Sequence, residues 1–299
     1  MLKQHHVLGK TYVIETPSTF IPVYHLNERE VVLLDTGFAS DREALMELLH
    51  DRRWQVRGVI CSHGHMDHSG NIRFLQERYG CRVAAHEIEA EIAATPESFR
   101  SHYCVSTPDE NGGLEESFSA TDIITPQTRQ FLFCGAEFYI LQLPGHSGGH
   151  IGVITPDNVA YLGDALMGMA QLAASKMPTT GHLRRDLESK RSLHNLEAAA
   201  YIVPHKNIMS DIHPLIDANI RCYEAKARGI LVSLRGEMTL KQWLCAYCEE
   251  QQVSVRSEDG FFVLKYGFRS MVEYLVETGE VRALHVDDAA VYVHADKGK

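Results

Sequence analysis

The sequence has no apolar run that approaches the ~20 residues of a membrane-spanning helix. Its first residues, Met1-Leu2-Lys3-Gln4-His5-His6, also lack the apolar segment of a secretory signal. We therefore expect a cytoplasmic protein without a membrane partner. Of the 299 residues, 44% are apolar and 23% are charged. This composition excludes a disordered chain and is typical of a globular protein with a sizeable core.

The small number of basic residues and the odd number of cysteines narrow the class of protein further. Basic residues are outnumbered, with 29 Lys and Arg against 39 Asp and Glu, and the net charge of −10 weighs against nucleic acid as a partner. The seven cysteines are an odd number scattered along patterned segments, which favours reduced thiols over a disulfide framework. Cys245 and Cys248 form a lone CxxC in a predicted helix, without a second pair that would indicate a zinc site.

What the sequence does contain is a cluster of metal-ligand side chains directly after a strand. Val59-Ile60-Cys61 is an apolar run typical of a buried strand, and His63, His65, Asp67 and His68 follow it closely. Imidazole and carboxylate groups are ligands that zinc and similar divalent ions prefer. Side chains two residues apart on this loop can point to the same side, whereas those of the adjacent Asp67 and His68 must point to different sides. The loop could therefore supply ligands to two neighbouring ions. The alternative is a set of solvated histidines on a surface turn.

The pattern His63-x-His65-x-Asp67-His68 resembles the signature of the metallo-beta-lactamase superfamily. The resemblance implies an α/β (α+β) fold, an αββα sandwich of two mixed sheets packed face to face with a metal site at one edge. The N-terminal order of strand, helix, strand and ligand loop agrees with an α/β fold. The family also has an Asp-Thr-Gly corner near its site, and Asp35 is therefore expected to support the site without binding metal.

The resemblance implies further ligands, each placed after a strand. His146 matches the family's third histidine, in a Pro-Gly-His sequence whose glycine allows close approach to a metal centre. His150 is expected to be hydrogen bonded and not a ligand, because the first ion's histidines leave its open position to water. Asp164 follows a glycine at a strand end and is expected to bridge two ions through its two oxygens.

His205 follows the last strand of this part and is the expected final ligand, although it lacks the family's flanking glycines. His182, His194 and His213 remain competitors for this place. The complete set gives three ligands to each ion and one ligand to both. The first ion would be held by His63, His65 and His146, the second by Asp67, His68 and His205, and Asp164 would be shared.

The C-terminal part has a pattern of its own. We predict helices over residues 217–234, 239–251 and about 268–279, a hairpin over 253–263 and a final hairpin around Asp287-Asp288. This order resembles the winged-helix appendage of some superfamily members, including relatives of the beta-lactamase-like RNA endonuclease. It implies a catalytic domain over 1–216 and a small winged-helix-like domain over 217–299.

The charge of that third helix limits the winged-helix analogy. A helix that reads nucleic acid should present Arg and Lys, but this one shows Arg269 against Glu273, Glu277 and, just beyond it, Glu280. A structural module, or one that forms a homodimer, is preferred, and it is expected to help wall the active site.

Together these features predict a metallo-hydrolase with relatives such as glyoxalase II. Two divalent ions, zinc by default with iron or manganese also suited to the ligands, would provide a metal-bound hydroxide at neutral pH. Asp67 is the expected catalytic side chain, as a proton shuttle. A small-molecule ester, thioester or lactone is the expected substrate, and residues 98–127 and 165–180 are lid candidates.

Three alternatives remain open from the sequence. The first is a mononuclear iron enzyme of the persulfide dioxygenase type, which uses a subset of the same ligands. The second is a single-stranded RNA endonuclease or phosphodiesterase, which the charge opposes. The third is a binding protein with an idle metal site.

Overall fold

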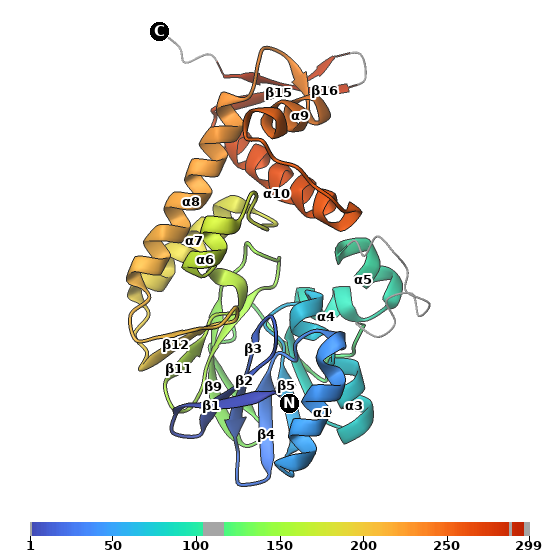
Figure 1. Cartoon of the computed structure of the whole chain (residues 1–299), viewed down its shortest axis with the longest axis vertical. Coiled ribbons are helices and arrows are strands. Elements are labelled where there is room, and N and C mark those ends of the chain that lie inside the picture. The colour runs from blue at the N-terminus through green and yellow to red at the C-terminus, as the bar shows by residue number, and fades with distance from the viewer. Residues whose placement is uncertain (1, 104–116, 287–288, 296–299) are drawn as a thin grey trace.

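A computed structural model describes residues 2–103, 117–286 and 289–295. Two sheets lie face to face with helices on both outer sides (Figure 1). The first sheet has its strands in chain order: β1 (Lys3–Leu8), β2 (Thr11–Glu15), β3 (Phe20–His25), β4 (Glu30–Leu34), β5 (Gln55–Ile60), β6 (Arg82–His86) and β7 (Asp122–Ile124). The second runs β13 (Asn207–Met209), β12 (Ala200–Val203), β11 (Val159–Tyr161), β10 (Ile151–Ile154), β9 (Ala136–Gln142) and β8 (Gln130–Phe133).

Continuous runs of apolar residues explain why both faces of the first sheet are buried. In β4, Val31 and Leu33 pack on the outer helices, whereas Val32 and Leu34 pack between the two sheets. Successive side chains of a strand point to opposite faces, so this continuous apolar run covers both layers. The predicted αββα sandwich is confirmed.

The helices of each outer layer follow the sheet that they cover. Beside the first sheet lie α1 (Arg42–Asp51), α2 (Met66–Ser69), α3 (Ile72–Tyr79), α4 (Glu87–Ala93) and α5 (Pro96–Tyr103). Beside the second lie α6 (Met169–Ala174), α7 (Leu183–Ser192) and α8 (His213–Val232). Single 3-10 turns are η1 (Ala39–Asp41), η2 (Gly163–Ala165) and η3 (Leu193–Asn195). Among the described residues, no helix has the length and apolarity that crossing a membrane would require.

The C-terminal elements extend from one end of the sandwich. The long helix α8 connects the second sheet to α9 (Leu240–Glu250), α10 (Glu258–Glu277) and a small sheet (Figure 1). That sheet has the order β14 (Met238–Thr239), β16 (Ala289–His294) and β15 (Val281–Val286). The boundary predicted between residues 216 and 217 falls in the first turn of α8. The division into two domains and the winged-helix assignment stay predictions.

One predicted element is wrong. Residues 253–263 do not form a hairpin, because α10 already begins at Glu258. The Ser257 side chain accepts a hydrogen bond from the Gly260 backbone N–H at 3.1 Å and caps the helix. Leu264 and Phe268 then lie on the buried side of α10. An Asp-Gly pair is a strong local turn signal, but the cap and the burial of one helix face outweigh it here.

The first lid candidate, residues 98–127, contains regular structure in part. Helix α5 continues to Tyr103, and β7 adds a parallel strand to β6. Residues 104–116 lie outside the described residues. The second lid candidate, residues 165–180, contains the short helix α6.

Candidate metal centre

The predicted ligands all follow the carboxyl ends of strands. His63 and His65 lie in the loop after β5, and Asp67 and His68 lie in the short helix α2 that continues it. The other ligands come from the second sheet, after β9, β11 and β12, which run in the same direction. His146, Asp164 and His205 occupy these three positions. Ligands from both sheets therefore meet at one edge of the sandwich, as α/β folds commonly arrange them.

The first group of ligand atoms comprises His63, His65, His146 and Asp164, and these atoms all lie within 4.8 Å of one another. Nδ1 of His65 lies 2.9 Å from Nε2 of His63 and 2.9 Å from Nε2 of His146. Oδ2 of Asp164 lies 3.5 Å from Nε2 of His146. Three nitrogens and one oxygen converge on one point.

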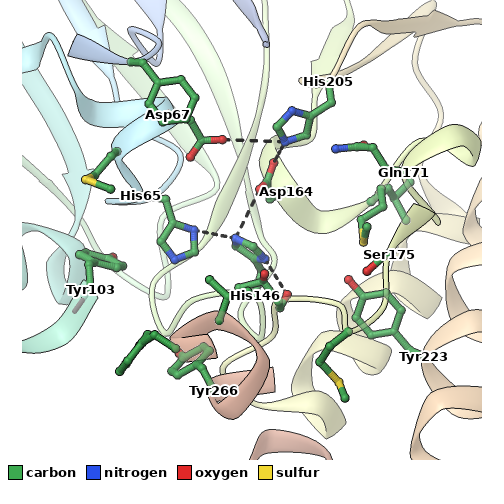
Figure 2. A pocket seen from close by; sticks show the side chains of 18 of the residues that line it. His65, Asp67, Tyr103, His146, Asp164, Gln171, Ser175, His205, Tyr223 and Tyr266 are labelled. Carbon is green, nitrogen blue, oxygen red and sulfur yellow. Dashed lines mark hydrogen bonds and ion pairs between the residues drawn. The ribbon is translucent and has the colours of Figure 1, made fainter. Parts of the chain in front are cut away.

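The second group comprises Asp67, His68, Asp164 and His205, again within 4.8 Å. Oδ1 of Asp164 lies 3.3 Å from Nε2 of His68 and 3.4 Å from Nε2 of His205. Asp67 Oδ2 lies 3.5 Å from the same nitrogen of His68. Asp164 thus directs one oxygen toward each group, and Figure 2 shows it between His146 and His205.

In His68, His146 and His205, the second ring nitrogen, Nδ1, has a hydrogen-bond partner. Nδ1 of His68 lies 2.7 Å from Asp35 Oδ2, and Nδ1 of His146 and His205 lie 3.1 and 3.2 Å from the backbone carbonyls of Thr179 and Ser18. A carbonyl only accepts, so Nδ1 of His146 and of His205 must donate. Each Nε2 then keeps its lone pair for a metal ion.

Two buried atoms test whether the groups suit a cation. Nε2 of His68 and Oδ1 of Asp164 lie 3.3 Å apart as an ion pair, but both are buried and neither has a hydrogen-bond partner among the described residues. Buried polar atoms are rarely left unpaired, because this costs about 1–3 kcal/mol each. Both atoms belong to the second group, where a divalent ion would satisfy them together. The donor set of nitrogen and carboxylate oxygen atoms therefore fits zinc, iron or manganese.

The electrostatics of the groups agree with this fit. Burial lowers the pKa of His65 to about 3 and that of His63 well below its usual range, so both rings are neutral at neutral pH. Burial also disfavours a proton on His68, yet Asp67, Asp164 and Asp35 outweigh burial and raise its pKa well above the ordinary value. A positive charge is therefore favoured among these carboxylates.

The four other histidines that the sequence offered near the site or as competitors are engaged elsewhere. His150 Nε2 accepts a hydrogen bond from the Asp164 backbone N–H at 2.9 Å, and its Nδ1 lies 3.2 Å from the Leu143 carbonyl oxygen. It is hydrogen bonded on both nitrogens, as expected. The three competitors of His205 each face a carboxylate outside both groups: His182 faces Glu277, His194 faces Asp217 and His213 faces Asp211.

The model of the metallo-beta-lactamase superfamily matches residues 16–205, more than half of the chain and a span that contains all seven predicted ligands. The chain belongs to the metallo-beta-lactamase superfamily. Solved structures support the fold over a longer range. A metallo-beta-lactamase family protein from Thermus thermophilus superposes with a TM-score of 0.72, covers 98% of both chains and is 20% identical. A beta-lactamase domain protein from Burkholderia ambifaria gives 0.73 at 16% identity, over 98% of this chain and 94% of its own.

Curated relatives within the superfamily carry hydrolase names. A probable metallo-hydrolase of Bacillus subtilis (strain 168) is 26% identical over 55% of this chain and 63% of its own length. A hydroxyacylglutathione hydrolase of Haemophilus influenzae is 24% identical over 47% of this chain and 63% of its own. One of Nitrobacter winogradskyi is 36% identical over 44% and 42%. The matches cover less than two thirds of each relative, and their names agree with the predicted metallo-hydrolase.

Glu89 is a buried residue of this metallo-beta-lactamase fold that the sequence analysis missed. Its Oε2 accepts from the backbone N–H of Gly64 at 2.9 Å and from the Tyr103 hydroxyl, and its Oε1 accepts from Ser147 Oγ at 2.8 Å and from the Gly149 N–H at 2.9 Å. It therefore joins α5 to the loops that carry His63, His65 and His146. The available signal was a carboxylate four residues before the buried Ala93, on the apolar side of a short helix.

A pocket of about 400 Å³ opens beside the two groups. His65, Asp67, His146, Asp164 and His205 form its floor, and Figure 2 shows Tyr103 on one side and Gln171, Ser175 and Tyr223 on the other. Phe262, Val263 and Tyr266 of α10 complete the wall. The sequence suggested that the C-terminal part helps to enclose the site, but it did not indicate that α10 is the element that reaches it.

Proposed function

We propose that this protein is a metal-dependent hydrolase with a binuclear centre that acts on a small ester, thioester or lactone. The carrying observation is the pair of four-residue groups that share Asp164, with two unpaired buried atoms in the second group. His63, His65 and His146 would hold one ion, Asp67, His68 and His205 the other, and Asp164 both. Bound divalent ions supply a water molecule of lowered pKa and positive charge for a developing oxyanion.

Side chains of the protein position the reacting groups and transfer protons. Asp67 lines the pocket and lies 3.9 Å from Nε2 of His205 and 3.5 Å from Nε2 of His68. This position suits a carboxylate that receives a proton from water and passes it to a leaving group. Asp35 orients His68, and the Tyr161 hydroxyl and Ser62 backbone N–H fix Asp35 in turn, at 2.5 and 2.6 Å.

The binuclear proposal is favoured over a mononuclear iron centre because a second complete group of ligands is present. Zinc is the proposed ion, and iron or manganese would suit the same donors. The reaction is that of a small-molecule enzyme because the ligand atoms face a pocket of this size.

The first test is elemental analysis of the protein purified without added metal, with one variant in the first group and one at the shared ligand. We expect about two ions per chain in the wild type, loss of bound metal in His63→Ala and in Asp164→Asn, and unchanged content in the control His213→Ala. His213 is exposed and belongs to neither group, so it controls for the loss of a histidine as such. One ion per chain in the wild type would refute the binuclear proposal.

Thermal unfolding gives a second readout that does not depend on turnover. A ligand that binds only the native state stabilises it, by about 2.7 kcal/mol at a hundredfold excess over Kd. Chelation should therefore lower the melting temperature of the wild type and of His213→Ala by similar amounts, and that of His63→Ala by less, because this variant keeps only the second group of ligands intact. Hydrolysis of esters, thioesters and lactones by the metal-loaded protein then tests the activity itself.

A further inference from the structure

The wall of the pocket combines apolar and uncharged polar side chains, and its one histidine outside the metal groups, His102, packs edge to face against the Tyr103 ring at 4.9 Å. Among the described residues that line it, none is Lys or Arg. Apart from the metal-binding floor, half of the lining residues are apolar. Its apolar members are Phe38, Met66, Leu166, Met167, Met177 and the α10 pair Phe262 and Val263. A carboxylate or phosphate against this wall would find no Lys or Arg among the described lining residues with which to pair.

Neighbouring segments do not correct this shortage. Lys176 follows the lining residue Ser175, but its Nζ donates to the Ser254 carbonyl at 3.3 Å. The net charge of −10 adds a general repulsion of anions.

Uncharged hydrogen-bonding groups are nevertheless available on one side. Gln171 uses its Oε1 to accept from the Gly168 N–H at 3.0 Å, which leaves its Nε2 to donate toward the pocket. Ser175 and Tyr223 lie on the same side (Figure 2). Such groups suit the carbonyl or amide of a neutral ligand.

We propose that the pocket selects neutral substrates, namely esters or thioesters whose acyl and leaving groups are uncharged and largely apolar. Glutathione thioesters, which carry carboxylates, are disfavoured. This substrate class rests on the proposed hydrolase function. In the reaction, water adds to the acyl carbon, the C–S or C–O bond breaks, and the leaving group takes one proton of that water to give a thiol or alcohol and a carboxylic acid.

The physical reason is the cost of placing an unpaired charge against an apolar wall. Removing an ionised group from water without a partner opposes binding strongly, whereas burial of each CH₂ of a neutral chain favours binding. A carboxylate that stays partly hydrated at the pocket mouth opposes binding less. We therefore expect a preference of at least about tenfold, which corresponds to ~1.4 kcal/mol.

The test compares two thioethers that cannot be hydrolysed and share one alkyl chain. S-hexyl-N-acetylcysteamine is neutral, and S-hexylglutathione carries two carboxylates and one ammonium group. Titration calorimetry with the metal-loaded protein should give a Kd at least about tenfold lower for the neutral compound. Equal affinity, or tighter binding of S-hexylglutathione, would overturn the proposal, and neither result depends on turnover.

A matched pair of variants locates the preference in the wall. Val263 and Phe261 are both exposed residues of α10, at 42% and 53%, but only Val263 lines the pocket. Val263→Lys should shift the ratio of the two Kd values toward S-hexylglutathione by about threefold or more, because it adds a cation at the wall. Phe261→Lys should leave the ratio unchanged. An equal shift in both variants would assign the preference to general charge and reject the wall as its source.

Activity with the corresponding S-hexanoyl thioesters separates this proposal from the function on which it rests. Turnover of both compounds with similar kcat/KM would reject the neutral preference and retain the hydrolase. Absence of turnover of either compound, with a preserved binding preference, would reject thioester hydrolysis and retain the neutral pocket.

Discussion

Replacement of Glu89 should affect three segments around the site. Its carboxylate accepts four hydrogen bonds that join α5 to both histidine-bearing loops. A Gln at this position keeps one acceptor oxygen and turns an NH₂ group toward donors. We expect Glu89→Gln to lower the free energy of unfolding by about 2–4 kcal/mol, measured by urea denaturation, because buried donors lose a charged acceptor.

The same variant should weaken metal binding if Glu89 positions the ligands. Residues that support metal ligands typically contribute about 10–100-fold to metal affinity. Competition with a chromophoric chelator measures this loss, and Glu91→Gln is the control, since Glu91 lies on the same helix with an exposed side chain. Loss of stability without loss of metal affinity would leave Glu89 a purely structural residue.

At the scale of single elements, α7 supports the loop that carries His146. A Cβ on Gly145 would lie 2.2 Å from the backbone of Asp186, and Ser189 Oγ donates to the Pro144 carbonyl at 2.7 Å. Gly145 has φ of +138°, so this close approach needs glycine for both conformation and space. The helix and the ligand loop therefore pack without room for a larger residue.

A buried ion pair within α7 gives a test of this packing. Lys190 Nζ contacts Asp186 Oδ1 one turn away, and both side chains are almost completely buried. Lys190→Met should lower the free energy of unfolding by about 3–5 kcal/mol, because Asp186 would keep an unpaired buried charge. Arg269→Met is the control, since Arg269 and Glu273 have the same spacing but exposed side chains. That variant should change stability by less than about 1 kcal/mol, and similar losses in both would contradict the role of burial.

At the scale of the whole molecule, one apolar cluster crosses the predicted domain boundary. It includes Leu143 and Leu162 beside the second sheet together with Trp243 of α9 and Phe268 of α10. The rings of Trp243 and Phe268 pack edge to face at 5.7 Å. A continuous core favours unfolding as one cooperative unit, because neither part can expose its side of the cluster alone without cost.

The two tryptophans allow this cooperativity to be measured. Trp54 is buried in the N-terminal part and Trp243 in the C-terminal part, and the sequence has no others. In Trp54→Phe and in Trp243→Phe, urea unfolding followed by fluorescence and by far-UV circular dichroism should give one common midpoint within each variant. Two separate transitions would show instead that residues 1–216 and 217–299 unfold independently.

The metal ligands could be predicted because their signal is local. His63, His65, Asp67 and His68 lie within one short loop after an apolar strand, and the later ligands also follow strands. Ligand chemistry needs particular residue types, and the ends of parallel strands bring such residues together in space. These two constraints operate over a few residues and can be recognised in the order of the chain.

The residues that support the site and those that form its wall could not be predicted from the sequence, because their positions depend on contacts between distant segments. Glu89 meets Gly64 and Ser147 only when α4 packs beside both loops, and no pattern in Glu87–Ala93 specifies those partners. Val263 reaches the pocket only because α10 continues through an Asp-Gly pair that favours a turn locally. Burial of one helix face against a core is a cooperative gain of the folded chain, and it outweighs local preferences that the sequence displays one segment at a time.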